Sequence, residues 1–197
     1  MLPSLSEALA ALYGVLRPAR FALSGIRWVD PSPAAARRSF IVLLPLTLVW
    51  LLQTYMLRGT IDETQLLDAW IAYPLTVLNK LVSVLFFYLV LDSRLRKTGG
   101  RDHFPLYVSA QNWASLPVAL IVLLLNVVWM VVGISENMLM WTAVILQTVI
   151  IVYSWILTVA SLRLSHLVAF AICVLEILSG LLVDIIMRIV LQATYSS

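Results

Sequence analysis

The sequence predicts an all-α integral membrane protein, a bundle of five transmembrane helices with an N-terminal amphipathic interfacial helix. Of its 197 residues, 62% are hydrophobic and only 12% are charged, whereas soluble domains are about half apolar and about a quarter charged. The apolar residues fall into long continuous segments, each near the roughly 20 residues that a spanning helix needs. Continuous rather than alternating apolar character argues against a membrane β-barrel.

The N-terminal segment, 1–30, predicts a helix that lies on the membrane surface. Leucines recur every three or four residues from Leu5 to Leu16 and so share one helical face, and Ser4 or Ser6 is a candidate N-cap. An apolar stripe followed by arginines among aromatic residues is typical of interfacial helices, and anionic lipid headgroups are the expected partner of those arginines. The alternative is a helix packed on the bundle or docked on a partner. The arginines are Arg17, Arg20 and Arg27.

The remaining residues, 31–197, form the predicted transmembrane domain. Pro31 and Pro33 disfavour a helix that continues from the first segment, and Asp30 or Ser32 is a candidate cap for the next helix. The predicted spans are, in chain order, about 40–57, 66–91, 104–132, 138–162 and 167–191.

The basic residues predict the orientation of these spans. Lys and Arg gather before the first span, after the second and after the fourth, while the other connections hold the acids Asp62, Glu63 and Glu136. Because Lys/Arg bias sets topology, we expect a cytoplasmic N-terminus and a periplasmic C-terminus in a bacterial inner membrane. The basic residues are Arg17, Arg20, Arg27, Arg37 and Arg38, then Arg94, Arg96, Lys97 and Arg101, then Arg163.

Charged residues inside the predicted spans are candidates for a functional pair. Lys80 and Glu176 lie at about half depth on the second and fifth spans, which run antiparallel, so an ion pair between them is predicted, with Asn79 as an added hydrogen-bond partner. Asp184 and Arg188 are four residues apart and are expected to pair along the fifth span. Such pairs hold helices together, form a proton or ion path, or contact another subunit or a lipid headgroup, and the sequence leaves these roles open.

The third span has a polar start. Gln111, Asn112 and Ser115 lie between Pro105 and Pro117, and proline frees backbone carbonyls that nearby polar side chains can satisfy. One interpretation is a small polar cavity open to the cytoplasm. The other is a tilted helix whose first turns lie in the headgroup zone.

Catalytic and metal-binding patterns are absent from the sequence. His103 and His166 are not in HExxH spacing, no GxSxG or phosphate-binding glycine loop is present, and the single cysteine, Cys173, forms no cluster. We therefore expect neither an enzyme nor a cofactor, a metal site or a nucleic-acid partner.

Two stretches resemble a known family. "YVSAQNWASLP" (107–117) and "YSWILTVASLRLSHLVAFAICVLEILSGLLVD" (153–184) are similar to uncharacterised alphaproteobacterial proteins of the Yip1-like five-span superfamily. The resemblance implies a five-span fold in a membrane. The eukaryotic relatives act in membrane trafficking with small GTPases, but their acidic-Leu-Gly-Pro-type motif is missing here, so that activity is not carried over. The matching residues are Asn112, Trp113, Trp155, Ala160, Leu164 and 176–182.

Short connections and the absence of a catalytic constellation lead to a non-enzymatic function. The first expectation is a scaffold or accessory subunit that assembles with other membrane proteins or with itself. The alternative is a small transporter or channel-like protein that uses Lys80 and Glu176.

Overall fold

The computed structural model describes residues 2–20, 22–58, 69–98, 100–133 and 135–195, and this part of the chain is helical without strands. Short 3-10 turns connect some of the helices, among them η1 (Pro18–Arg20), η2 (Leu23–Trp28) and η3 (Phe40–Val42). The α-helices are α1 (Leu5–Leu16), α2 (Pro33–Ser39), α3 (Leu43–Arg58), α4 (Ala69–Thr98), α5 (Phe104–Val132), α6 (Glu136–Leu162) and α7 (His166–Tyr195).

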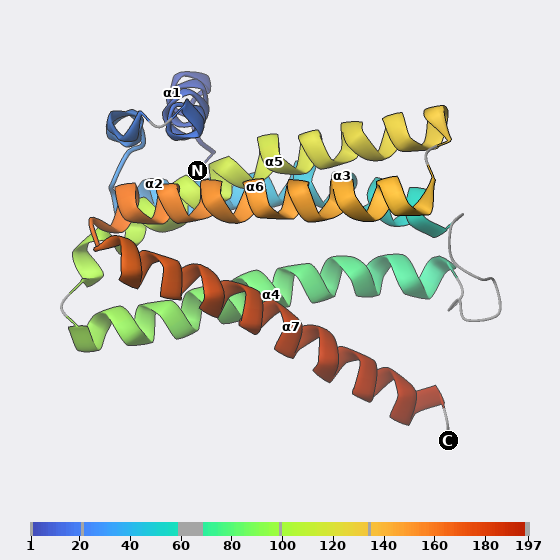
Figure 1. Ribbon diagram of the computed structural model, residues 1–197. Coiled ribbons are helices and arrows are strands. Elements are labelled where there is room, and N and C mark those ends of the chain that lie inside the picture. Colours follow the sequence, from blue (N-terminus) through green and yellow to red (C-terminus); the bar gives the residue numbers. More distant parts are fainter. Residues whose placement is uncertain (1, 21, 59–68, 99, 134, 196–197) are drawn as a thin grey trace.

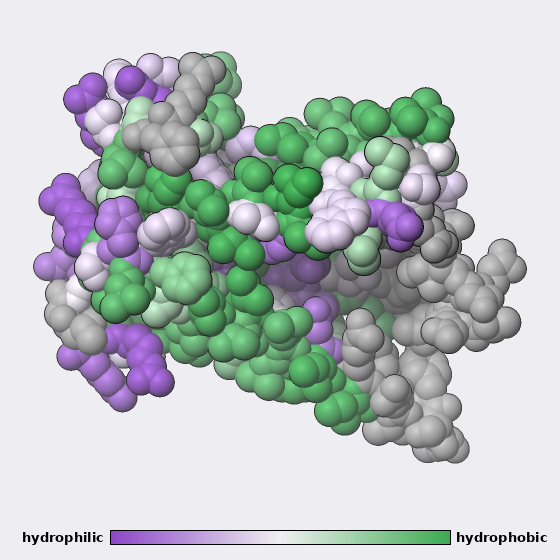
Figure 2. Space-filling model, in the orientation of Figure 1, coloured by the Kyte–Doolittle hydropathy of each residue, from purple (hydrophilic) through white to green (hydrophobic). Residues whose placement is uncertain are grey.

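Five helical segments of the described chain are long and apolar enough to cross a membrane, which confirms the predicted fold class. Their outward faces carry large apolar side chains, and apolar surface covers the middle of the molecule while polar surface gathers at one end (Figure 2). An apolar belt of this kind is what a bilayer covers. The segments are Pro33–Met56, Pro74–Lys97, Arg101–Val132, Asn137–Leu162 and His166–Met187.

The helices α3 to α6 run along roughly one axis, α7 is tilted against it, and the connections lie at the two ends of the bundle (Figure 1). Helix α5 packs on α3 and α6, and α7 packs on α4 and α6. The N-terminal elements, the α4–α5 connection and the α6–α7 connection lie together at what we call the basic end, whereas the α5–α6 connection and the end of α7 lie at the opposite end. The basic end is defined by Arg37, Arg38, Arg96, Arg101 and Arg163.

Two left-handed residues make the short connections between spans possible. Gly133 has φ 66° and its N–H bonds to the carbonyl of Trp129, which ends α5. Arg163 has φ 54° and its N–H bonds to the carbonyl of Val159, which ends α6. A residue in this conformation satisfies the last carbonyls of a helix and turns the chain back at once.

The N-terminal helix presents most of its leucines away from the bundle, whereas Leu12 packs against the core. The Ser4 side chain accepts from the N–H of Glu7 at 3.1 Å, which confirms Ser4 as the N-cap. Small residues of α1, including Ala11 and Val15, are buried against the bundle, whereas Leu5 is 77% exposed and Leu9 and Leu16 are also exposed. Since the bundle already covers the small-residue face, the leucine face is left for the bilayer.

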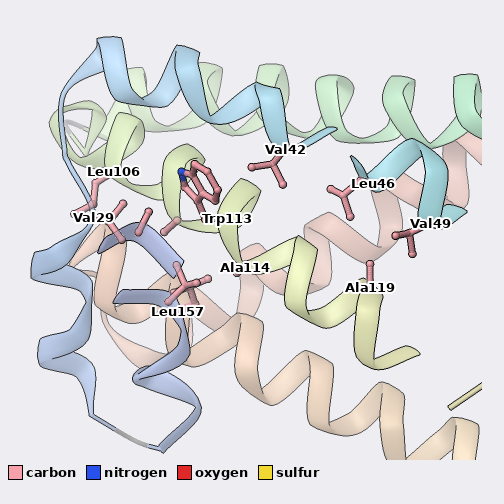
Figure 3. Close-up of a cluster of buried hydrophobic side chains, with 12 residues drawn as sticks. Val29, Val42, Leu46, Val49, Leu106, Trp113, Ala114, Ala119 and Leu157 are labelled. Carbon is pink, nitrogen blue, oxygen red and sulfur yellow. The ribbon is translucent and has the colours of Figure 1, made fainter. Parts of the chain in front are cut away.

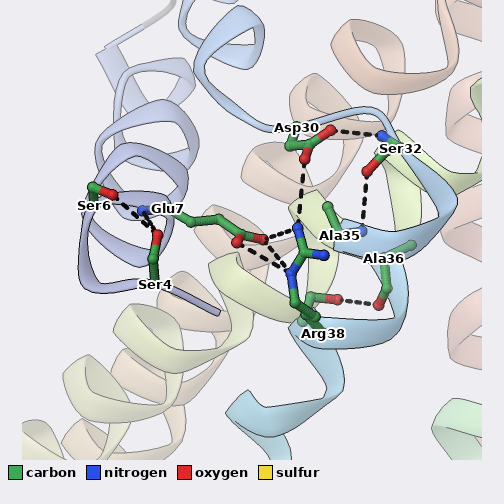
Figure 4. A network of polar contacts seen from close by, with 9 residues as sticks. Ser4, Ser6, Glu7, Asp30, Ser32, Ala35, Ala36 and Arg38 are labelled. Atoms are coloured by element: carbon green, nitrogen blue, oxygen red, sulfur yellow. Dashed lines mark hydrogen bonds and ion pairs between the residues drawn. The ribbon is translucent and has the colours of Figure 1, made fainter. Parts of the chain in front are cut away.

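An ion pair holds this helix to the start of the first span. The Arg38 guanidinium bonds both carboxylate oxygens of Glu7, with a shortest distance of 2.9 Å, and reaches Asp30 at 3.6 Å (Figure 4). Ser32 caps α2 by accepting from the N–H of Ala35 at 3.1 Å, while Asp30 accepts from the N–H of Ser32. Both candidate caps therefore act in the same turn.

The N-terminal segment and the spans share one apolar core. Val29, which follows η2, is buried with Leu46 of α3, Trp113 of α5 and Leu157 of α6 (Figure 3). The segment 1–30 is therefore packed on the bundle.

Helix α4 extends further toward the basic end than the predicted span. Its C-terminal end is at Thr98 rather than near residue 91, where Arg96 pairs with Asp92 at 2.6 Å and Leu95 is buried. Lys80 lies in the interior of this helix, and its side chain is exposed. The predicted start of this span at 66–68 lies outside the described residues.

Candidate intramembrane cavity

A cavity of about 280 Å³ lies inside the bundle, and all five spanning segments contribute side chains to its wall. Its polar lining residues come from α4, α5, α6 and α7, while α3 contributes apolar ones. The polar ones are Ser83, Tyr88, Gln111, Asn112, Ser115, Tyr153, Ser154 and Glu176.

Glu176 is the charged residue of this wall. It lies near the middle of the His166–Met187 segment, where an ionisable group is costly and is a functional-site candidate by default. The hydroxyl of Ser154 on α6 donates to its carboxylate at 3.4 Å. The cavity therefore has an acidic group at mid-depth.

A chain of donors leads from α5 to this carboxylate. The side-chain amide of Gln111 donates to the hydroxyls of Tyr107 at 3.1 Å and Ser154 at 3.2 Å. Ser154 in turn donates to Glu176, so side chains of α5 and α6 are oriented toward one acceptor on α7. Such a chain aligns the amide and hydroxyl dipoles with the Glu176 carboxyl group.

The side of the cavity nearer the basic end is closed by a satisfied polar network within an aromatic cluster. Asn112 is 2% exposed; it accepts from the Tyr88 hydroxyl at 2.9 Å and donates to Ser39 at 2.9 Å, and Ser39 donates to the carbonyl of Ala36 at 2.7 Å. The two side-chain bonds of Asn112 join α5 to α4 and to α2, so this network fixes helix positions. The rings packed edge-on or tilted around Tyr88 are Phe40, Phe87, Phe104 and Tyr107.

Toward the opposite end, α4 and α7 are joined by a second polar contact. The side-chain amide of Asn79 donates to the carboxylate of Asp184, and the Asn79 carbonyl oxygen is buried without a hydrogen-bond partner. The hydroxyl of Ser83, one turn along α4, donates to the backbone carbonyl of Asn79 at 2.8 Å. The side chain of Arg188 lies outside the described residues, and so does its predicted pair with Asp184.

The predicted ion pair between Lys80 and Glu176 is not formed. Asn79 faces Asp184, and Glu176 lies eight residues before Asp184 on α7, which is about 12 Å along the helix. Lys80 is exposed on the outside of α4, and Glu176 bonds Ser154 instead. The prediction was wrong because Asn79, and not Lys80, is the residue of α4 that faces α7.

The polar start of the third span does line a cavity. Gln111, Asn112 and Ser115 all contribute to its wall, as the first of the two interpretations expects. The sequence analysis missed Ser154, Tyr88 and Tyr107, which bond the predicted residues. Serine and tyrosine occur in many spans without function, so only their spatial convergence identifies them.

The chemistry available in this cavity is binding rather than metal coordination. Among the residues that the structure describes, no group of three or more His, Cys, Asp or Glu side chains could hold a metal ion. The Glu176 carboxylate, the side-chain amide of Gln111 and several hydroxyls suit a small solute that is cationic or donates hydrogen bonds. Comparison with protein families, with curated proteins and with solved structures finds no match for this chain, so its function is argued from this cavity.

Proposed function

We propose that this integral membrane protein is a small transporter that binds a cationic solute in the central cavity, with the Glu176 carboxylate as counter-charge. This is the second of the two functions that the sequence predicted. The observation that carries it is the position of Glu176, in a cavity that all five spanning segments line. A residue needed only to hold two helices together has no need of a cavity beside it.

The size of the cavity supports a small solute. About 280 Å³ is near the lower limit of the roughly 300–1,000 Å³ typical of ligand pockets. A small solute with one positive charge fits this space and can interact with the acceptor groups in its wall. A primary amine such as methylammonium or ethanolammonium has this chemistry.

The position of the cavity supports transport in particular. Secondary transporters bind their substrates near the bilayer midplane and open alternately to the two sides. Here the Tyr88 cluster lies toward the basic end and the Asn79–Asp184 contact lies toward the opposite end. Each is a discrete set of contacts that can open while the other stays closed, as alternating access requires.

One observation favours the scaffold or accessory-subunit function as the second candidate. Lys80 is exposed on α4, whereas a charge in a span normally faces the interior of its bundle. An acid on another subunit is one way to satisfy it. The alternative is that the long lysine side chain extends along the outside of α4 toward a membrane surface.

The orientation follows from the charges. We infer that the basic end faces the cytoplasm of a bacterial inner membrane and that the C-terminus faces the periplasm, since Lys and Arg are retained on the cytoplasmic side. A reporter fused after Ser197 and active only outside the cytoplasm is the expected result. Membership of the Yip1-like superfamily and a non-enzymatic role stay predictions.

Uptake of methylammonium into liposomes tests the transporter function. The wild-type protein is expected to take up labelled methylammonium faster than empty liposomes, and Glu176→Gln is expected to lower the protein-dependent rate at least tenfold by removing the counter-charge. The matched control is Asp102→Asn, which removes an exposed acid outside the membrane at the basic end.

A hydrophobic carbodiimide provides the binding test, because it modifies carboxyl groups that lie inside membranes. Glu176 is expected to be modified, and ethanolammonium is expected to protect it. Uptake that equals that of empty liposomes, together with no protection by either amine, contradicts the transporter function. Stoichiometric co-purification of another membrane protein in that case favours the accessory subunit.

A further inference from the structure

A second cavity, of about 370 Å³, lies between the N-terminal elements and the helices α5 and α6. Its wall is apolar apart from Thr148 and Tyr153. The Thr148 hydroxyl donates to the carbonyl of Val144 at 2.8 Å, and the Tyr153 hydroxyl donates to the carbonyl of Val15 at 2.8 Å. Since both polar groups are already bonded within the protein, the cavity offers an occupant hydrocarbon contact only.

The cavity has the length and depth of one acyl chain. Its lining residues on α6 run from Leu146, near the middle of the Asn137–Leu162 segment, to Ile156 toward the basic end. Ten residues of helix measure about 15 Å. This equals half of a hydrocarbon core about 30 Å thick, which is the depth of a single leaflet.

The segment that forms the end of the cavity nearest the basic end contains an arginine. Leu16 and Ala19, which flank Arg17 and Pro18, line the cavity there. The Arg17 guanidinium lies 5.5 Å from the ring centre of Tyr13, and that ring packs edge-on against Trp28. Arginine beside amphipathic aromatic rings is the composition of the headgroup zone, and a guanidinium binds phosphate through several N–H groups.

The N-terminal segment makes this cavity a fixed groove rather than a stretch of open helix surface. The Glu7–Arg38 ion pair and the Tyr153–Val15 hydrogen bond hold the segment against the bundle. Pro117 and Ile121 of α5 form another side. A wall that is already in place lowers the entropy cost of ordering a chain against it.

We propose that this groove binds one acyl chain of an anionic phospholipid, whose phosphate is held by Arg17. The site is separate from the central cavity and does not depend on the transport function. It commits the interfacial segment to a specific lipid, where the sequence predicted only a general attraction to anionic headgroups.

Native mass spectrometry of the detergent-solubilised full chain tests this site with phosphatidylglycerol and phosphatidylcholine as probes. The wild-type protein is expected to retain one phosphatidylglycerol and to prefer it at least tenfold over phosphatidylcholine. Val149→Trp fills the groove and is expected to lower that retention at least tenfold. The control is Ile145→Trp, one turn earlier on α6 and outside the groove, because Val149 and Ile145 are similarly exposed, at 59% and 62%.

A second pair of variants tests the headgroup. Arg17→Gln is expected to bring the preference for phosphatidylglycerol over phosphatidylcholine close to one, whereas Arg163→Gln, which removes another exposed arginine at the same end, is expected to leave it unchanged. Circular dichroism verifies that each variant is folded, and Ile121→Trp replaces Val149→Trp if the latter is not.

Three results overturn the proposal. The first is a wild-type protein that retains no lipid. The second is equal retention of the two lipids, which removes the role of the arginines. The third is equal loss of lipid in Val149→Trp and Ile145→Trp, which shows bulk lipid or a docked helix rather than an occupied groove.

Discussion

Asn79 of α4 donates a hydrogen bond to the carboxylate of Asp184 of α7, and this contact reveals how the two antiparallel helices are aligned. With Asn79 opposite Asp184, the stretch of α4 one to two turns further along lies level with Glu176, and its residues Ser83, Val84 and Phe87 line the cavity with Glu176. Lys80 is left on the outside of α4. One interhelical contact therefore accounts both for the cavity and for the missing ion pair.

The coupling between Asn79 and Asp184 is measurable by a double-mutant cycle. Asn79→Ala and Asp184→Ala are expected to be non-additive by about 1 kcal/mol in unfolding by SDS in mixed micelles, the size typical of hydrogen bonds between membrane helices. Asn79→Ala combined with Asp92→Ala, at the far end of α4, is the control and is expected to be additive. Additivity in both pairs contradicts the contact.

Lys80→Met is expected to change the free energy of unfolding by less than about 0.5 kcal/mol, as is usual for an exposed side chain. The same unfolding assay checks this result. An ion pair with Glu176 demands a much larger loss, because Lys80→Met then leaves the Glu176 carboxylate buried without its counter-charge. A loss well above 1 kcal/mol in Lys80→Met identifies a partner for the lysine.

Gly25→Ala is expected to loosen the N-terminal segment. A Cβ at Gly25 meets the Cβ of Arg17 at 2.5 Å and the backbone oxygen of Gly14 at 2.7 Å, so the backbone of α1 or η2 has to move. Overpacking of this kind costs about 1–3 kcal/mol. Gly180→Ala is the control, since nothing lies within 4 Å of a Cβ there. Thermal unfolding in detergent compares the two, and equal melting temperatures contradict the close approach.

Arg38→Gln is expected to release α1 from the bundle. The ion pair with Glu7 is partly exposed, so its contribution to stability is at most about 1 kcal/mol, but it acts on a helix with few other polar anchors. Faster cleavage by trypsin after Arg27 is the expected readout. The neighbouring exposed residue provides the control, Arg37→Gln, and identical cleavage rates for the two variants count against the anchor.

The cavity shows why the candidate site was only partly predictable. Glu176, Gln111 and Asn112 were identified because polar residues are rare and costly in a span. Their partners Ser154 and Tyr88 carry no such signal, and they are found only because helix packing brings them within hydrogen-bond distance.

Hydropathy and charge in the sequence by themselves determined the class of protein, the number of spans, the start of α5 and the end with the basic residues. Each of these depends on the transfer of a segment between water and lipid, which is a sum over local residues. The outward position of Lys80, the alignment of α4 with α7 and the two cavities were decided by the tertiary structure alone. These depend on where helix α4 ends and on which side chains interlock across helices, and an apolar segment looks the same in sequence after a shift of two turns.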